Sequence, residues 1–125
     1  MKNVLIATVF VLVCAVFLYP GTISQVKVGY ETAVEGPFPA SVVFRGDTVM
    51  CSWRTSGIQG NVKIELCRDN HVAVHTIHPR YPYNDLPKTF KIPQRIIPGR
   101  YYVKVGQGRV LGKSNFFTIK KNRGI

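Results

Sequence analysis

Short runs of alternating apolar and polar residues, separated by turn-forming residues, constrain the fold of this chain most. In TVMCSW, residues 48–53, the side chains of Val49, Cys51 and Trp53 fall on one face and the intervening ones on the other. A period of two is typical of a half-buried strand, and no window longer than ten residues follows the 3.6-residue period of a helix. The pattern therefore predicts strands, and no long helix, after residue 24.

The same alternation recurs along the chain and separates side chains that face a core from those that face solvent. Strands are expected in residues 26–34, 40–44, 48–53, 61–67, 71–77, 89–93, 100–105 and 115–120. Inward side chains are expected at Val49, Cys51, Trp53, Val62, Ile64, Leu66, Phe90, Ile92, Tyr101, Val103, Val105, Phe117 and Ile119, and outward ones at Lys63, Glu65, Tyr102 and Lys104. GPFP at 36–39 is expected to break the first strand, and GQGRVLGKS at 106–114 to connect a hairpin.

About seven short strands with regular turn signals in some 100 residues predict an all-β fold. The expected architecture is a single antiparallel immunoglobulin-like β-sandwich over residues 25–120, preceded by an N-terminal apolar helix. Residues 121–125 are expected to be a short basic tail.

The first 24 residues differ from the rest of the chain. Val4 to Tyr19 is an uncharged apolar run of 16 residues, and a proline and a glycine follow it. This pattern indicates a secretory signal peptide cut before Gln25. The alternative is a retained membrane anchor, although a helix of that length reaches about 24 Å, less than the roughly 30 Å hydrocarbon core. Either outcome delivers the domain across a membrane, so the expected location is secreted or at the cell surface.

The order of several motifs resembles a known domain family. GDTVMCSWRTSG is followed by VKIEL, TFKIP, IPGRYYVKV and SNFFTI, which together cover residues 42–120. This order is similar to the immunoglobulin-like N-terminal domain of fungal cell-wall glucan assembly proteins and of Ser/Thr-rich anchored surface proteins. The resemblance implies a secreted or surface, non-enzymatic sandwich module.

Two cysteines follow the leader and leave a disulfide open. Alternation turns Cys51 inward and Cys67 outward, whereas a disulfide needs Cα atoms within about 7 Å and converging Cβ vectors. A bulge at the strand end would redirect Cys67, and an oxidising compartment favours pairing.

The charge of the chain is strongly basic and regional. It carries 17 Lys and Arg against 6 Asp and Glu, a net charge of +11, and Asp85 is the last acidic residue. Such a field attracts polyanions. The candidates for binding an anionic polysaccharide, a lipid headgroup surface or nucleic acid are Lys63, Arg100, Lys104, Arg109, Lys113, Lys120 and Lys121.

The proline-rich segment HPRYPYNDLPK, residues 78–88, is the most distinctive loop and cannot be a central strand. Arg80, Tyr81, Tyr83 and Asn84 are its candidate ligand contacts, because rigid exposed tyrosines suit sugar stacking or protein recognition. The alternative is that the tyrosines fold back over the core.

No residue pattern predicts catalysis, a cofactor or a metal. His71, His75 and His78 would share a helical face, but a strand sends His78 to the opposite side, and no carboxylate or cysteine lies beside them at ligand spacing. No nucleophile motif is present. We therefore expect a non-enzymatic module for adhesion, envelope structure or assembly, which contacts an envelope polymer or a protein partner. Self-assembly through edge strands is a further expectation, and nucleic-acid binding is the alternative function.

Overall fold

The computed structural model describes residues 21–32 and 36–122, which form strands, turns and connections without a helix. The apolar segment 4–19, expected to be helical, lies outside these residues, as do the last three residues of the basic tail. No helix in the described ranges is long and apolar enough to cross a membrane.

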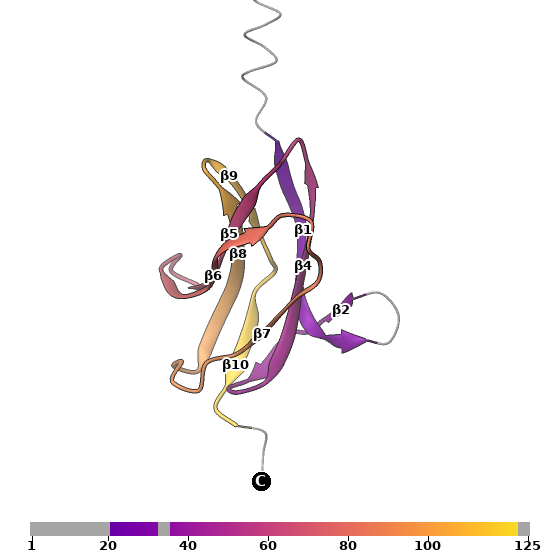
Figure 1. The fold of residues 1–125 in the computed structure, drawn as a ribbon. Helices are drawn as coiled ribbons and strands as arrows, with labels where there is room; N and C mark the ends of the chain where they lie inside the picture. The colour runs from indigo at the N-terminus through magenta and orange to yellow at the C-terminus, as the bar shows by residue number, and fades with distance from the viewer. Residues whose placement is uncertain (1–20, 33–35, 123–125) are drawn as a thin grey trace, which may run out of the picture.

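The strands form two sheets that face each other across one core (Figure 1). The four-stranded sheet has the order β2-β1-β4-β7, and the six-stranded sheet has the order β3-β10-β8-β5-β6, with β9 paired to β8. The strands are β1 (Thr22–Thr32), β2 (Gly36–Pro39), β3 (Val42–Phe44), β4 (Thr48–Ser56), β5 (Asn61–Arg68), β6 (Ala73–Pro82), β7 (Lys88–Lys91), β8 (Gly99–Gln107), β9 (Val110–Lys113) and β10 (Phe117–Lys120).

The expected alternation is confirmed on the inner faces of both sheets. All thirteen side chains predicted to face inward are buried and belong to one hydrophobic cluster. Ile23, Val26 and Val28 of β1 and Val43 of β3 also belong to this cluster, as do Ile58, Tyr81 and Ile96. The predicted all-β fold is therefore confirmed, with apolar burial between the two sheets as its main source of stability.

Strand number and direction differ from the expectation. The structure has ten strands rather than about seven in its described part, because GPFP pairs with the end of β1 as β2, and part of the expected hairpin connection forms β9. The sheets are also not wholly antiparallel, since β3 pairs with β10 in parallel. The chain crosses from one sheet to the other between β2 and β3, and therefore meets β10 in the same direction.

Strand β8 lies at the centre of the six-stranded sheet. It pairs with β5 on one side, while β10 and β9 share the other side in succession. Ser114 bridges the gap between β9 and β10: its backbone N–H donates to the carbonyl of Val103 at 2.9 Å, and its Oγ accepts from the N–H of Val103 at 2.8 Å. These bonds keep β8 paired along its length, as a central strand requires.

Strand β6 forms one edge of this sheet. It contains Pro79 and Pro82, which fits the expectation that the proline-rich segment is not a central strand. Its pairing with β5 shifts register at three places, so the edge is bent rather than flat.

Candidate functional site

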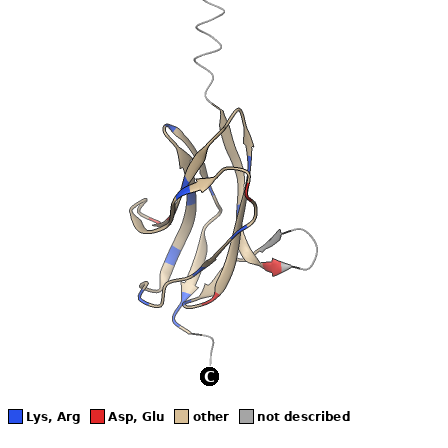
Figure 2. Cartoon of the chain, viewed as in Figure 1, with Lys and Arg blue, Asp and Glu red and all other residues tan. Residues whose placement is uncertain are grey.

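The outer face of the six-stranded sheet carries the basic residues that alternation turns away from the core. Register sets Glu65 of β5 opposite Lys104 of β8, and Lys104 opposite Lys113 of β9. Lys63 and Arg100 lie on the same outer face, Lys63 two residues from Glu65 along β5 and Arg100 four residues from Lys104 along β8. Figure 2 shows Lys and Arg distributed along the strands of both sheets and in the connections at their ends, with fewer acidic residues.

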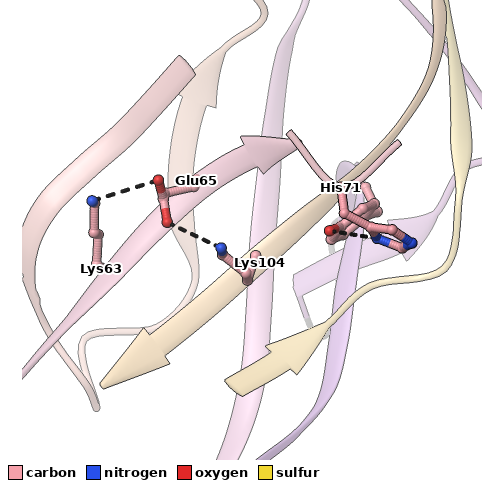
Figure 3. A network of polar contacts seen from close by, with 5 residues as sticks. Lys63, Glu65, His71 and Lys104 are labelled. Atoms are coloured by element: carbon pink, nitrogen blue, oxygen red, sulfur yellow. Dashed lines mark hydrogen bonds and ion pairs between the residues drawn. The ribbon is translucent and has the colours of Figure 1, made fainter. Parts of the chain in front are cut away.

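A single carboxylate partly neutralises this face. Glu65 accepts from Lys63 Nζ and from Lys104 Nζ, each at 3.5 Å (Figure 3), and these are the two ion pairs within the described ranges. Lys113 lies directly opposite Lys104 on the neighbouring strand, and has no carboxylate within ion-pair distance in that part of the chain. Like charges directly opposite each other on a sheet are destabilising. The face therefore keeps an excess of positive charge at a cost to the fold.

Aromatic rings support the cations at one end of the face. Lys113 Nζ lies 5.6 Å from the centre of the Tyr102 ring, and the Arg100 guanidinium carbon lies 4.4 Å from the centre of the Phe116 ring. The two rings meet edge to face with centres 5.5 Å apart. Cation–π contacts of this kind hold the cations without neutralising them.

Tyr102 points outward as predicted but is buried, with only 2% of its surface exposed. His71 covers it from the turn between β5 and β6, with ring centres 5.7 Å apart and the Nδ1 atom 3.1 Å from the Tyr102 hydroxyl (Figure 3). Burial is the largest cause that raises the pKa of Tyr102, and the neighbouring Cys67 adds to it. No local sequence signal predicted this cover, because His71 and Tyr102 are 31 residues apart.

The disulfide left open by the sequence is not present. Both thiols are free and buried: Cys51 faces the core from β4, and Cys67 lies on the outer side of β5 beside Tyr102. The alternation that separates them holds, and the register shift next to Cys67 does not turn it inward. Burial raises the pKa of both thiols, for Cys51 without any compensating charge.

The other predicted polyanion contacts lie apart from this face's centre. Arg109 is exposed in the turn between β8 and β9. Lys120 ends β10 and Lys121 follows it, at the opposite end of the sheet. The structure thus brings together three of the seven candidates, Lys63, Lys104 and Lys113, on the strands β5, β8 and β9, while Arg100 lies four residues from Lys104 along β8, at the end of the sheet where β10 ends in Lys120.

The tyrosines of the proline-rich segment fold back over the core, which was the alternative to two exposed ligand contacts. Tyr81 is buried against Trp53, with ring centres 6.0 Å apart, and its hydroxyl donates to the carbonyl of Asp85. Tyr83 packs against the core, and its carbonyl accepts from Trp53 Nε1 at 2.9 Å. A buried indole N–H needs a hydrogen-bond acceptor, and the loop supplies it through the carbonyl of Tyr83. The loop therefore packs over the end of the core. Of its four candidate ligand contacts, Arg80 and Asn84 are exposed.

The three histidines are spread over different environments. His71 covers Tyr102, His75 is exposed, and His78 packs on Tyr81 with ring centres 5.2 Å apart. Within the described ranges, no three histidine, cysteine or acidic side chains gather to hold a metal ion.

One groove was not anticipated from the sequence. It has a volume of about 360 Å³ and opens between β1 and the link from β9 to β10, where Val26, Lys27, Ser41, Asn115 and Phe116 line it. It forms where β1 has a bulge and where β9 ends and β10 begins. Both features depend on how strands pair, which the local sequence pattern does not show.

No protein-family model matches the chain, and no curated protein is significantly similar to it in sequence. What the chain does is therefore inferred from the arrangement of its own residues.

Proposed function

We propose that this chain is a non-enzymatic module, secreted or held at the cell surface, which binds anionic envelope polymers through the outer face of its six-stranded sheet. The observation that carries the proposal is the cross-strand pair Lys104 and Lys113, with Lys63 next to it, Glu65 as the one carboxylate among them, and Arg100 further along β8 on the same face. Such a pair costs stability on its own, and a bound anion would relieve that cost.

The proposed architecture behind this function is immunoglobulin-like, as the resemblance to fungal surface-protein domains implies. Two observations support it. The sheet orders place β1, β4 and β7 on one side and β5, β8 and the β9–β10 pair on the other, which is the division found in immunoglobulin sandwiches. Tyr101, near the start of β8, donates its hydroxyl to the carbonyl of Ile97 four residues upstream, as in the tyrosine corner of that fold.

An anionic polysaccharide suits the face better than nucleic acid does. Single-stranded nucleic acid is held largely by bases that stack on exposed aromatic rings. Tyr102 is covered by His71, and one face of the Phe116 ring is taken by Arg100. The cations are therefore accessible while stacking surfaces are scarce, which favours a ligand recognised by charge.

Binding to dextran sulfate, a model sulfated polysaccharide, tests the proposal. The double variant Lys104→Glu with Lys113→Glu changes the net charge by −4 and should weaken binding at least tenfold, because the local field is reversed. The control is Lys27→Glu with Lys91→Glu, which makes the same change at exposed positions of the other sheet.

Affinity measured from 50 to 300 mM salt should fall steeply for the native protein and less steeply for the outer-face variant, because fewer counterions are released. Equal losses in the two double variants would show that net charge, not this face, governs binding. No binding at low salt would overturn the proposal. Nucleic-acid binding would be the better description if a single-stranded oligonucleotide competed more strongly than dextran sulfate at equal charge.

A further inference from the structure

Three exposed apolar side chains lie in two segments that both contact Tyr102 next to the basic face, the β5–β6 connection through His71 and the link from β9 to β10 through Phe116. Val72 and Val74, at the junction of the β5–β6 turn and β6, are 54% and 41% exposed, and Phe116, beside Tyr102, is 40% exposed. Figure 1 shows the β5–β6 connection projecting from the sheet on the side away from the four-stranded sheet. Val72, Val74 and Phe116 are called the apolar tip below.

The turn that carries Val72 and leads to Val74 is held by several hydrogen bonds. The N–H of Arg68 donates to the carbonyl of Val72 at 2.9 Å, and the N–H of Val72 donates to the side-chain oxygen of Asn70 at 3.1 Å. His71 has a positive φ of 68°, a conformation that is uncommon for a residue other than glycine, and its ring rests on Tyr102. The exposed valines are thus presented on an ordered turn rather than on a loose loop.

Two cations lie beside the apolar tip. Arg100 lies over the Phe116 ring and Lys113 over the Tyr102 ring, whereas Arg68 pairs with Tyr101 and lies over the ring of that core residue, on the inner side of the sheet. Asp69 is the one acidic residue of the turn, and its N–H donates to the carbonyl of Arg100. Exposed apolar side chains with a basic rim are typical of surfaces that meet an anionic apolar partner.

We propose that the apolar tip docks this protein on an anionic lipid bilayer. Val72 and Val74 enter the boundary between headgroups and acyl chains, Phe116 lies at headgroup level, and Arg100 and Lys113 contact lipid phosphates. This goes beyond polymer binding: it uses two cations of the same face, but it depends on apolar residues that a polysaccharide does not need.

A bilayer fits the apolar tip better than a protein does. A stable protein interface buries about 800 Å² on each partner with close shape complementarity, and three apolar side chains do not form a core for one. A second copy would bring the same cations into apposition, and the bends of β6 interrupt an edge on which strands could pair. A fluid bilayer requires no fixed shape, and it rewards cations and apolar residues together.

Fluorescence quenching by brominated lipid tests the proposal on the full-length chain. Val74→Trp places a reporter in the apolar tip, and Leu86→Trp places one at a site of matched exposure, 40%, in the connection from β6 to β7. The native Trp53 is buried and supplies a constant background. Vesicles of brominated phosphatidylcholine with 30 mol% phosphatidylserine should quench the Val74→Trp emission and leave that of Leu86→Trp unchanged.

Two further variants examine the electrostatic part. Asp69→Asn removes the acidic residue of the turn and should raise affinity for the anionic vesicles about fivefold, while Arg100→Glu should lower it by tenfold or more. Dextran sulfate binding should hardly change in Val74→Trp, which separates this proposal from polymer binding.

Several results would overturn the lipid proposal. Equal quenching of both reporters, or quenching that is as strong without phosphatidylserine, would mean that another part of the chain brings the protein to the membrane. No quenching of Val74→Trp in a protein that binds dextran sulfate would reject the lipid proposal and leave polymer binding intact. A change of Val74→Trp emission with protein concentration, in the absence of vesicles, would identify a second copy as the occupant.

Discussion

The corner where β1 meets β9 offers a sharp test of the packing. A Cβ atom added at Gly112 would lie 2.7 Å from Ile23 Cγ2, 2.8 Å from the carbonyl oxygen of Ile23, and 3.0 Å from Val26 Cγ2. The carbonyl is part of β1, whose Ile23 pairs with Thr55 of β4, so it cannot retreat without disturbing that sheet. Gly112→Ala therefore forces the two sheets apart at this corner.

The magnitude follows from two opposing terms. Overpacking of a well-packed site costs about 1–3 kcal/mol, while replacing glycine by alanine in a strand returns roughly 0.5–1 kcal/mol of chain entropy. We expect a net loss of about 1–2 kcal/mol in the free energy of unfolding. The matched control is Gly99→Ala in β8, where the nearest atom to the new Cβ is Tyr101 Cε2 at an ordinary 3.7 Å. It should be neutral or stabilising by up to about 1 kcal/mol.

Urea unfolding at 25 °C, followed by far-UV circular dichroism, measures both variants. With a slope of about 1–1.5 kcal/mol per molar urea, Gly112→Ala should lower the midpoint by about 1 M without changing the slope. A Gly112→Ala protein as stable as the Gly99→Ala control would refute the close approach of β1 and β9.

The same measurement bears on where a leader would be removed. Cleavage before Gln25 would fall within β1 and remove Ile23, a buried core residue that pairs with β4. A form that begins at Gln25 should be less stable than one that begins at Gly21 by about 2 kcal/mol or more. In the shorter form Gly112→Ala should cost under about 1 kcal/mol, since the contact with Val26 is the one of the three that stays. An unchanged cost would show that Ile23 does not make the contact.

Three further predictions follow from single sites. Trp53→Phe should lower the free energy of unfolding by about 2–3 kcal/mol in thermal or urea unfolding, because it leaves a cavity and a carbonyl without its donor; a loss below about 0.5 kcal/mol would contradict that role. Cys51 and Cys67 should resist a thiol reagent in the native protein, with or without reductant, and react on unfolding. Because burial raises the pKa of both thiols in the folded protein, the unfolded chain loses the thiol protons at a lower pH than the folded one. The free energy of unfolding should therefore be constant with pH below the ordinary thiol pKa of 9.0 and decrease as the pH rises above it; an increase above pH 9 would refute this sign. Lys113→Glu should raise the melting temperature slightly by pairing with Lys104, with a gain of about 0.5 kcal/mol, while polymer binding weakens; a lower melting temperature would contradict the like-charge cost.

Features that depend on local alternation could be predicted from the sequence. Val62, Ile64 and Leu66 face inward and Lys63 outward because a strand has a period of two, whichever strand it pairs with. The same reasoning correctly separated Cys51 from Cys67. Cys51 faces the core and Cys67 the outer side of its sheet, so their Cβ atoms cannot approach each other closely enough for a disulfide.

Features that depend on contacts between distant segments could not be predicted from the sequence. Tyr102 is outward-facing and yet buried, because a turn 31 residues earlier folds His71 over it. Tyr81 is buried because it packs on Trp53, and nothing in the spacing of prolines and tyrosines shows whether such a loop faces solvent or a core. The basic face was predicted from its residues, but its centre was not, since strand pairing decides which lysines are neighbours.

The balance of stability and charge on the outer face argues for a role in binding. A sheet selected for stability alone would place an acidic residue opposite Lys104 on both neighbouring strands. This protein has such a residue on one of them, Glu65 of β5. On the other it places Lys113, which rests on an aromatic ring instead of a carboxylate. If the pair served only solubility, Lys113→Glu would improve the fold and change nothing else. If the pair serves the proposed function, Lys113→Glu should raise stability and weaken polymer binding at the same time. The reason is that the new carboxylate pairs with Lys104 and thereby occupies the place that the anionic ligand would take.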